Sequence, residues 1–153
     1  MNHDYNRKVL IAVDESENSR RAVSYVSQTL RGLQGVDVVL LHVINPPEED
    51  YFSTQIEQEI WLRQYRREID GVLEQYRRIL VQEGFDPNAV DLKTTLRYRP
   101  SIAECILAEQ ARWGCGTIVV GRHGLSISEE FLFGSISSKI VSHAKNCTVW
   151  VVE

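Results

Sequence analysis

The chain has 153 residues, of which 43% are hydrophobic and 25% charged, proportions that are ordinary for a soluble globular protein. This length predicts a single domain, residues 1–153, that can bury a sizeable core. The formal net charge of −4 argues against general binding to nucleic acid or to anionic membranes, because both need a basic surface. A local basic site for a small anion stays open.

The cysteines and the apolar segments bear on the compartment. Cys105, Cys115 and Cys147 form no C-x-x-C pair, and their odd number suits a reducing compartment. The apolar run near the N-terminus is too short for a signal peptide, and no segment approaches the ~20 apolar residues that span a bilayer. We therefore expect a cytoplasmic protein with no membrane and no nucleic-acid partner.

The first half of the chain alternates β-rich runs with helical patterns. Residues 8–13 (KVLIAV) predict a strand that is buried on both faces and ends at Asp14. A helix with acidic groups in its first turn follows, and then a second strand over residues 36–44. A long helical pattern ends near Gln82, and Gly71 inside it disfavours one straight helix by roughly 1 kcal/mol.

The second half continues the alternation. Residues 90–97 alternate apolar and polar side chains, which predicts a half-exposed strand near one edge of the sheet. Ser101 and Glu104 have the spacing of a capping box and predict the start of the next helix. A fourth strand over residues 117–120 and a fifth over Thr148–Val152 enclose the last predicted helix.

Strands separated by helices predict an α/β fold, with a parallel sheet between two layers of helices. In such sheets ligands bind outside the carboxyl ends of the strands, where the strand order reverses. Asp14 follows the first strand and Gly121 the fourth. If these strands are neighbours, both residues face one crevice; the pattern alone leaves that adjacency open.

A glycine-rich stretch follows the fourth strand. Gly121 and Gly124 lie three apart, nine residues follow, and Gly134 and Ser135 then open a helical segment. Glycines let the backbone approach a ligand closely, and the unpaired N–H groups of a helix start favour an anion. The stretch therefore predicts a phosphate-binding loop, to which the Ser135 and Ser137 hydroxyls would donate hydrogen bonds.

Other phosphate and catalytic motifs are missing from the sequence. It has no G-x-x-x-x-G-K-[ST], no G-x-G-x-x-G after the first strand, no G-x-S-x-G and no H-E-x-x-H. Asp14 could accept a hydrogen bond from a ribose hydroxyl or an adenine amino group, and the alternative is a helix N-cap. His123 suggests a base, with a packing role as the alternative.

Together these features resemble the nucleotide-binding signature of the universal stress protein family. The resemblance rests on the glycine spacing, on VLIAVDES at residues 9–16, on LLHV at residues 40–43 and on the closing strand, and it covers nearly the whole chain. It implies an adenine nucleotide alpha hydrolase-like fold, with a five-stranded parallel sheet of order 3-2-1-4-5 and helices on both faces. It also implies bound ATP, with AMP or ADP as alternatives, and Mg²⁺ or Mn²⁺ held through the phosphates.

The resemblance assigns binding roles to individual residues and implies no catalytic residue and no protein ligand to a metal. The expected adenosine contacts are Ala12, Val13, Asp14 and Val43. The expected contacts to ribose and phosphates are Gly121, Arg122, Gly124, Gly134, Ser135, Ile136 and Ser137. One departure is Tyr98-Arg99-Pro100, where many relatives have Gly-x-Pro; a left-handed backbone there is strained without glycine, so we expect a differently shaped loop.

The expected function is that of an ATP-binding stress-response protein, a signalling module with an unknown protein partner rather than an enzyme. The family also implies a homodimer formed through Thr148–Val152, in which Trp150 and Val152 bury surface; the alternative is a strand covered within one subunit. Two other functions stay open: a slow ATPase or nucleotide transferase that uses Asp14 or His123, and a nucleotide-free dimeric interaction protein.

Overall fold

The computed structural model describes residues 6–123 and 134–153. Its sheet has five parallel strands in the order β3-β2-β1-β4-β5, as predicted. The strands are β1 (Lys8–Ala12), β2 (Asp37–Ile44), β3 (Val90–Leu96), β4 (Thr117–Gly121) and β5 (Thr148–Val152). The helices are α1 (Glu17–Leu30), α2 (Gln55–Gln82), α3 (Ile102–Trp113) and α4 (Ser135–His143), with the short 3-10 turns η1 (Glu49–Tyr51) and η2 (Pro87–Ala89).

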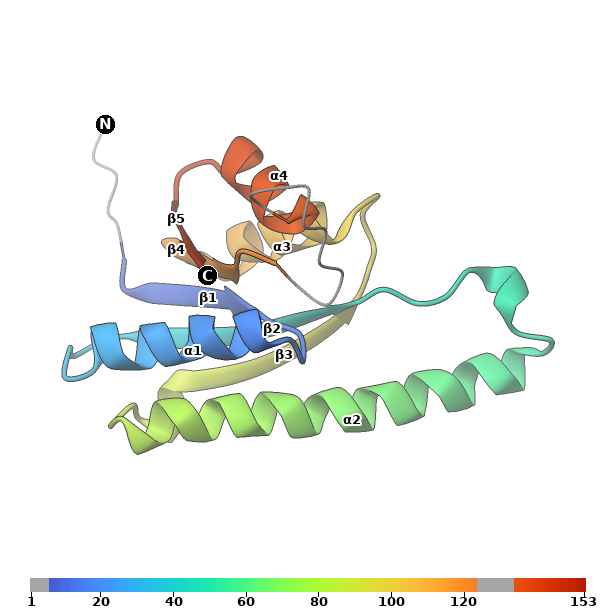
Figure 1. The fold of residues 1–153 in the computed structure, drawn as a ribbon, viewed down its shortest axis with the longest axis horizontal. Helices are drawn as coiled ribbons and strands as arrows, with labels where there is room; N and C mark the ends of the chain where they lie inside the picture. The colour runs from blue at the N-terminus through green and yellow to red at the C-terminus, as the bar shows by residue number, and fades with distance from the viewer. Residues whose placement is uncertain (1–5, 124–133) are drawn as a thin grey trace.

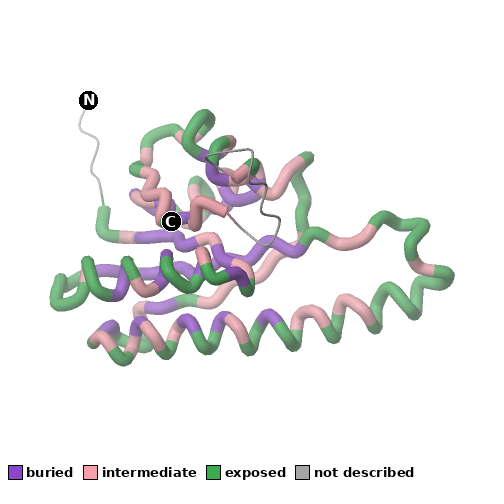
Figure 2. The backbone as a smooth tube through the Cα atoms, in the orientation of Figure 1, coloured by how far each residue is buried: buried purple, intermediate pink, exposed green. Residues whose placement is uncertain are grey.

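The helices form two layers around this sheet. α1 and α2 cover one face, and α3 and α4 cover the other (Figure 1). Side chains alternate along β1, so Val9 and Ile11 join the core under α1 and α2 while Leu10 joins the core under α3 and α4. Figure 2 shows that the middle of β1 is buried, while its two end residues are partly exposed. Two buried faces explain why the central strands are almost entirely apolar.

α2 is one continuous helix of 28 residues despite Gly71. Its C-terminal half is anchored to the sheet through buried side chains that include Leu73 and Leu80. Its N-terminal half, together with η1, extends beyond the sheet (Figure 1), and Tyr51 and Ile56 are exposed there. Across the described ranges, no helix is both long and apolar enough to cross a membrane.

The two edges of the sheet are β3 and β5. The edge position of β3 confirms the expectation drawn from its alternating sequence. β5 pairs with β4 on one side, and Trp150 packs edge-on against Tyr25 of α1 with 5.9 Å between ring centroids. Within residues 6–123 and 134–153, no strand pairs with the outer edge of β5.

The loop before α3 differs from a glycine turn, as the sequence suggested. Asn146 is the one non-glycine residue with a positive φ in the described part of the chain, so neither Tyr98 nor Arg99 adopts a left-handed backbone. Their backbone N–H groups instead donate to the buried Cys105 sulfur at 3.3 and 3.2 Å. The helix that follows is capped as predicted, by Ser101.

Candidate functional site

The candidate site is a cleft at the carboxyl ends of β1 and β4. The chain winds from β1 outward to β3, and then returns to place β4 on the other side of β1, so the strand order reverses there. The cleft has two parts, an apolar recess and a larger polar compartment. Both are lined by Asp14, Ile102, Gly121 and Ile136, so the two parts adjoin.

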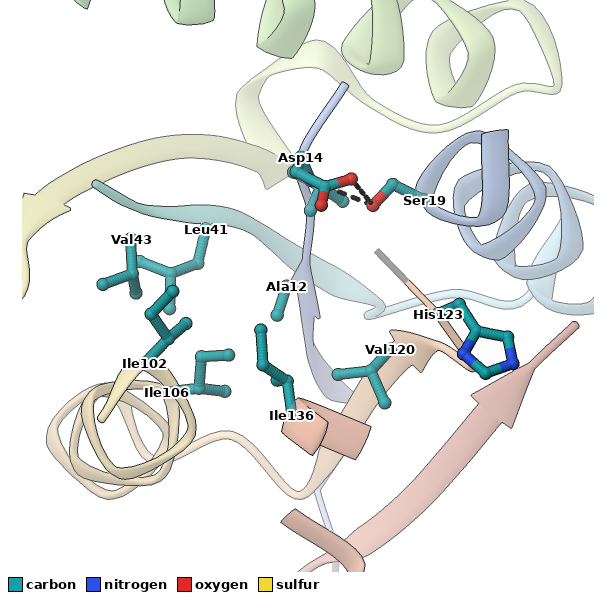
Figure 3. Close-up of a pocket in the computed structure, with 12 residues that line it drawn as sticks. Ala12, Asp14, Ser19, Leu41, Val43, Ile102, Ile106, Val120, His123 and Ile136 are labelled. Atoms are coloured by element: carbon teal, nitrogen blue, oxygen red, sulfur yellow. Dashed lines mark hydrogen bonds between the residues drawn. The ribbon is translucent and has the colours of Figure 1, made fainter. Parts of the chain in front are cut away.

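The apolar recess has a volume of about 90 Å³ and lies on the face of the sheet covered by α3 and α4 (Figure 3). Strand ends supply Ala12, Val43 and Val120, and the helices supply Ile106 and other branched side chains. These residues belong to, or pack against, the core cluster on this face, so the recess is an opening in that core. Such a recess suits a flat, apolar ring.

The polar compartment has a volume of about 570 Å³ and extends from the end of β4 to the ends of β2 and β3. Three cationic side chains line it: Arg97 after β3, Arg122 after β4 and Lys139 on α4. The Lys139 ammonium also lies 3.5 Å from the Glu104 carboxylate. Three cations against few acids make this part of the cleft suitable for an anion with several charges.

The start of α4 adds backbone donors to the same compartment. Gly134 is the N-cap and supplies no side-chain cap. The backbone N–H of Gly134 and the hydroxyl of Ser137 both donate to the carbonyl of Arg122, each at 2.8 Å, which fixes the helix start against the end of β4. The N–H groups of Ser135, Ile136 and Ser137 precede the first hydrogen bond of the helix, from Ser138 to Gly134, so they can bind phosphate oxygens.

The two described signature glycines serve packing inside the protein. A Cβ on Gly121 would lie 2.8 Å from the Asn18 Cβ, and one on Gly134 would lie 2.7 Å from the Arg122 carbonyl oxygen. Neither glycine has a positive φ. The sequence predicts that these glycines let the backbone approach a ligand closely. The contacts show a second reason for glycine, because α1 and the start of α4 pack directly against the end of β4 and leave no room for a Cβ. Gly124 lies outside the described residues.

Asp14 belongs to a compact turn at the end of β1. One carboxylate oxygen, Oδ1, accepts from the Ser16 N–H at 2.8 Å and from the Ser19 hydroxyl at 2.9 Å. Ser16, and not Asp14, is the N-cap of α1, so the N-cap interpretation of Asp14 is wrong. Within the described ranges its second oxygen, Oδ2, accepts no hydrogen bond, and Asp14 lines both parts of the cleft.

Arg122 and His123 lie where the described chain leaves β4. The Arg122 guanidinium pairs with Glu153 at 3.1 Å, yet its Nε is buried and has no partner among the described residues. The buried Nδ1 of His123 likewise has no partner in these ranges. Figure 3 shows the His123 ring beside the recess, close to Val120. The Arg122 Nε–H can only donate, so this end of the cleft suits a ligand with acceptor atoms.

The structure therefore brings most of the predicted binding residues into one cleft. Those that line it are Ala12, Val13, Asp14, Val43, Gly121, Arg122, Gly134, Ser135, Ile136 and Ser137.

Sequence reasoning missed Arg97, Lys139 and Tyr65, which also line the polar compartment. Arg97 had a usable signal, because it directly follows β3 and so lies at the carboxyl edge of the sheet. Lys139 also had one, because it stands four residues after Ser135 on the same helix face. Tyr65 had none, because its place in the cleft depends on how α2 packs against β2.

The sequence and the fold were both compared with known proteins. The model of the universal stress protein family matches residues 6–153. The hypothetical protein MJ0577 has a similar structure, with 26% identity, a TM-score of 0.79 and coverage of 97% of this chain and 95% of that one. A universal stress protein in complex with cAMP shows 17% identity, a TM-score of 0.71 and coverage of 98% and 99%. The universal stress protein from Archaeoglobus fulgidus in complex with dAMP shows 21% identity, a TM-score of 0.63 and coverage of 95% and 97%.

These matches agree with the fold and sheet order of this chain. The family model extends over nearly the whole chain, and the chain therefore belongs to the universal stress protein family.

Proposed function

We propose that this chain is an ATP-binding universal stress protein, in which the bound nucleotide controls conformation or the choice of protein partner. One observation carries the proposal: an apolar recess and a polar, cationic compartment adjoin at the point where the strand order reverses. An adenine nucleotide has a matching pair of parts, a flat base and a charged phosphate tail. Asp14, which lines both parts of the cleft, lies where the sugar would join them.

Two comparisons support an adenine nucleotide. The structures in complex with cAMP and dAMP have the fold of this chain and contain adenine nucleotides. The choice of ATP over a monophosphate rests on this chain's own compartment, which holds Arg97, Arg122, Lys139 and the open start of α4. This amount of positive charge suits a chain of phosphates better than a single one. AMP and ADP are the alternatives.

A divalent ion would be held mainly through the phosphates. In the described part of the chain, no group of three or more His, Cys, Asp or Glu side chains could form a metal site. Mg²⁺ commonly keeps several waters and binds phosphates with one or two carboxylates, so a sparse protein contribution fits Mg²⁺ or Mn²⁺.

We propose a binding role rather than catalysis, in the cytoplasm. An enzyme needs a base, and the candidates are Asp14 and His123. One oxygen of Asp14 is already bound by Ser16 and Ser19, as expected of a residue that shapes a turn. The proposed assembly is a homodimer through β5. The outer edge of β5 is unpaired in the described chain, and an unpaired apolar edge favours pairing with a strand of a second molecule.

Acid extraction of the purified protein, followed by chromatography of the extract, tests the proposal. We expect adenine nucleotide, mainly ATP, in near-equimolar amount. An extract without nucleotide, from protein that also fails to bind added ATP, would contradict the proposal and favour a nucleotide-free interaction protein. Release of ADP over time, abolished by Asp14→Ala or His123→Ala, would overturn the binding role in favour of an ATPase.

A further inference from the structure

A buried histidine beside the cleft has a defined hydrogen-bonding pattern. His42 is 5% exposed, and its Nδ1 lies 2.7 Å from the carbonyl oxygen of Val13. A carbonyl can only accept, so Nδ1 carries the hydrogen and donates. The other nitrogen, Nε2, lies 2.9 Å from the hydroxyl of Tyr65. With the hydrogen on Nδ1, the Nε2 of the imidazole offers a lone pair and accepts the Tyr65 hydrogen.

This pattern determines what Tyr65 offers to the cleft. Its single hydrogen is donated to His42, so only the lone pairs of its oxygen are left for a ligand. Its ring is fixed by stacking on Trp61, with 5.1 Å between centroids and 22° between planes. Burial, with the nearby carboxylates of Glu15 and Asp14, raises the pKa of Tyr65, so the phenol keeps its hydrogen at neutral pH.

Tyr65 and Asp14 both line the polar compartment. The Oδ2 of Asp14 can only accept hydrogen bonds, and Tyr65 offers an acceptor oxygen as well. Phosphate oxygens are acceptors and would find no donor at this pair. The hydroxyl groups of a sugar are donors and match it.

We propose that Tyr65 and Asp14 together recognise the ribose hydroxyl groups of the bound nucleotide, with His42 as the residue that positions Tyr65. This inference rests on the proposed function, because it assigns a subsite within the same cleft. It makes the protein selective for ribonucleotides over deoxyribonucleotides. Tyr65 thus contributes from α2, an element outside the glycine signature, to the specificity of the site.

Calorimetric titration of nucleotide-free protein with ATP, 2′-deoxy-ATP and 3′-deoxy-ATP tests the inference. The wild type is expected to bind ATP about tenfold more tightly than at least one deoxy analogue, the effect of one lost hydrogen bond. Tyr65→Phe keeps the ring stacked on Trp61 and removes only the hydroxyl. It is expected to lower ATP affinity to that of the deoxy analogue while leaving the affinity for that analogue unchanged.

Two further variants complete the test. Tyr98→Phe is the matched control, because it also removes one tyrosine hydroxyl, which here donates to Glu109. Tyr98 lines neither part of the cleft, so this variant is expected to keep the preference for ATP over the deoxy analogue. His42→Phe is expected to reduce the ribose preference, and its combination with Tyr65→Phe is expected to reduce it no further than Tyr65→Phe alone. If His42→Phe does not fold, Tyr65→Phe alone decides.

The same titration distinguishes a wrong role for Tyr65 from a wrong proposed function. Equal affinity of the wild type for all three nucleotides, or a preference that survives Tyr65→Phe, would overturn the role of Tyr65 while leaving ATP binding in place. No binding of any nucleotide would overturn the proposed function.

Discussion

Two cations that line the polar compartment, Arg97 and Lys139, lie outside the glycine signature. Arg97 reaches the polar compartment from the end of β3 and Lys139 from the second turn of α4. They approach from two different sides, so a long phosphate tail can contact both. AMP has a single phosphate next to the sugar, so its binding is expected to depend less on these two residues. These two residues are therefore expected to set the preference for ATP over AMP.

Replacing Arg97 and Lys139 by alanine tests that expectation. Each substitution removes an attraction worth roughly 1 kcal/mol at a partly exposed site, so the double variant is expected to bind ATP about 10- to 30-fold more weakly. AMP affinity is expected to change less than about twofold, since one phosphate is already served by the α4 start. Arg99→Ala, an exposed arginine outside the lining, is the matched control in calorimetry. Equal weakening of ATP and AMP would contradict this assignment.

A second tyrosine of α2, Tyr76, stabilises the turn that contains Asp14 through a hydrogen bond. Tyr76 is 4% exposed, and its hydroxyl donates to the backbone carbonyl of Asp14 at 2.6 Å. Tyr76→Phe leaves that partly buried carbonyl without this partner and is expected to lower the free energy of unfolding by about 1 kcal/mol. Chemical denaturation at neutral pH measures the loss. An unchanged midpoint would show that the hydrogen bond contributes nothing to stability.

The same residue predicts a pH dependence. Burial, with the nearby Asp14 carboxylate, raises the pKa of Tyr76 from 10.0 to about 12. The folded protein therefore holds this hydrogen more tightly than the unfolded chain does. The stabilisation is fully present below pH 10 and is lost as the pH rises toward 12, so the wild type is expected to lose its advantage over Tyr76→Phe across that range. A constant difference between the two proteins from pH 9 to 11 would contradict the assignment.

At the scale of elements, local signals predicted the fold well. Apolar periodicity located the strands and helices, and the Ser101 cap followed from a short motif. Gly71 shows the limit of propensity, because packing of the flanking turns on the sheet keeps α2 continuous. Contacts between distant segments were not predictable, and the clearest case is the His42–Tyr65 hydrogen bond, which joins residues 23 positions apart. Which side chain fills a cleft depends on tertiary packing, and no local pattern encodes that.

The predicted dimer forms through the backbone groups on the outer edge of β5. The Thr148 N–H donates to Gly116 and the Val152 carbonyl accepts from Arg122, so these alternate residues point toward β4. Val151 lies between Trp150 and Val152 in the strand, so its N–H points to the free edge. Val151→Pro removes that donor without breaking the pairing to β4, and it is expected to convert dimers to monomers.

Light scattering coupled to size-exclusion chromatography reports the outcome for Val151→Pro. Val151→Thr has nearly the same shape and keeps the backbone N–H, so it is expected to remain dimeric. A monomeric wild type, or a Val151→Pro variant that stays dimeric, would place any dimer interface elsewhere.

At the scale of the whole molecule, the cleft is built where several elements meet. β1 and β4 supply its floor, α3 and α4 its apolar wall, and the turn before α1 supplies Asp14. The polar compartment is lined from both helical layers of the fold, by Tyr65 of α2 and by Ile102 of α3, so a ligand bound there would contact both layers. Binding of the proposed nucleotide is therefore expected to alter how the two layers pack against each other, and the proposed signalling role depends on such a change.

The most direct test of ATP binding in this cleft is a calorimetric titration of nucleotide-free protein, wild type against Ala12→Leu. Ala12 lines the recess of about 90 Å³ and is only partly buried, so a leucine side chain can occupy the space proposed for adenine. Ala111→Leu makes the same change at an exposed position of α3, and thermal unfolding checks that both variants fold. We predict that the wild type and Ala111→Leu bind ATP equally, and that Ala12→Leu loses at least tenfold in affinity. Unchanged ATP binding by folded Ala12→Leu would contradict the account.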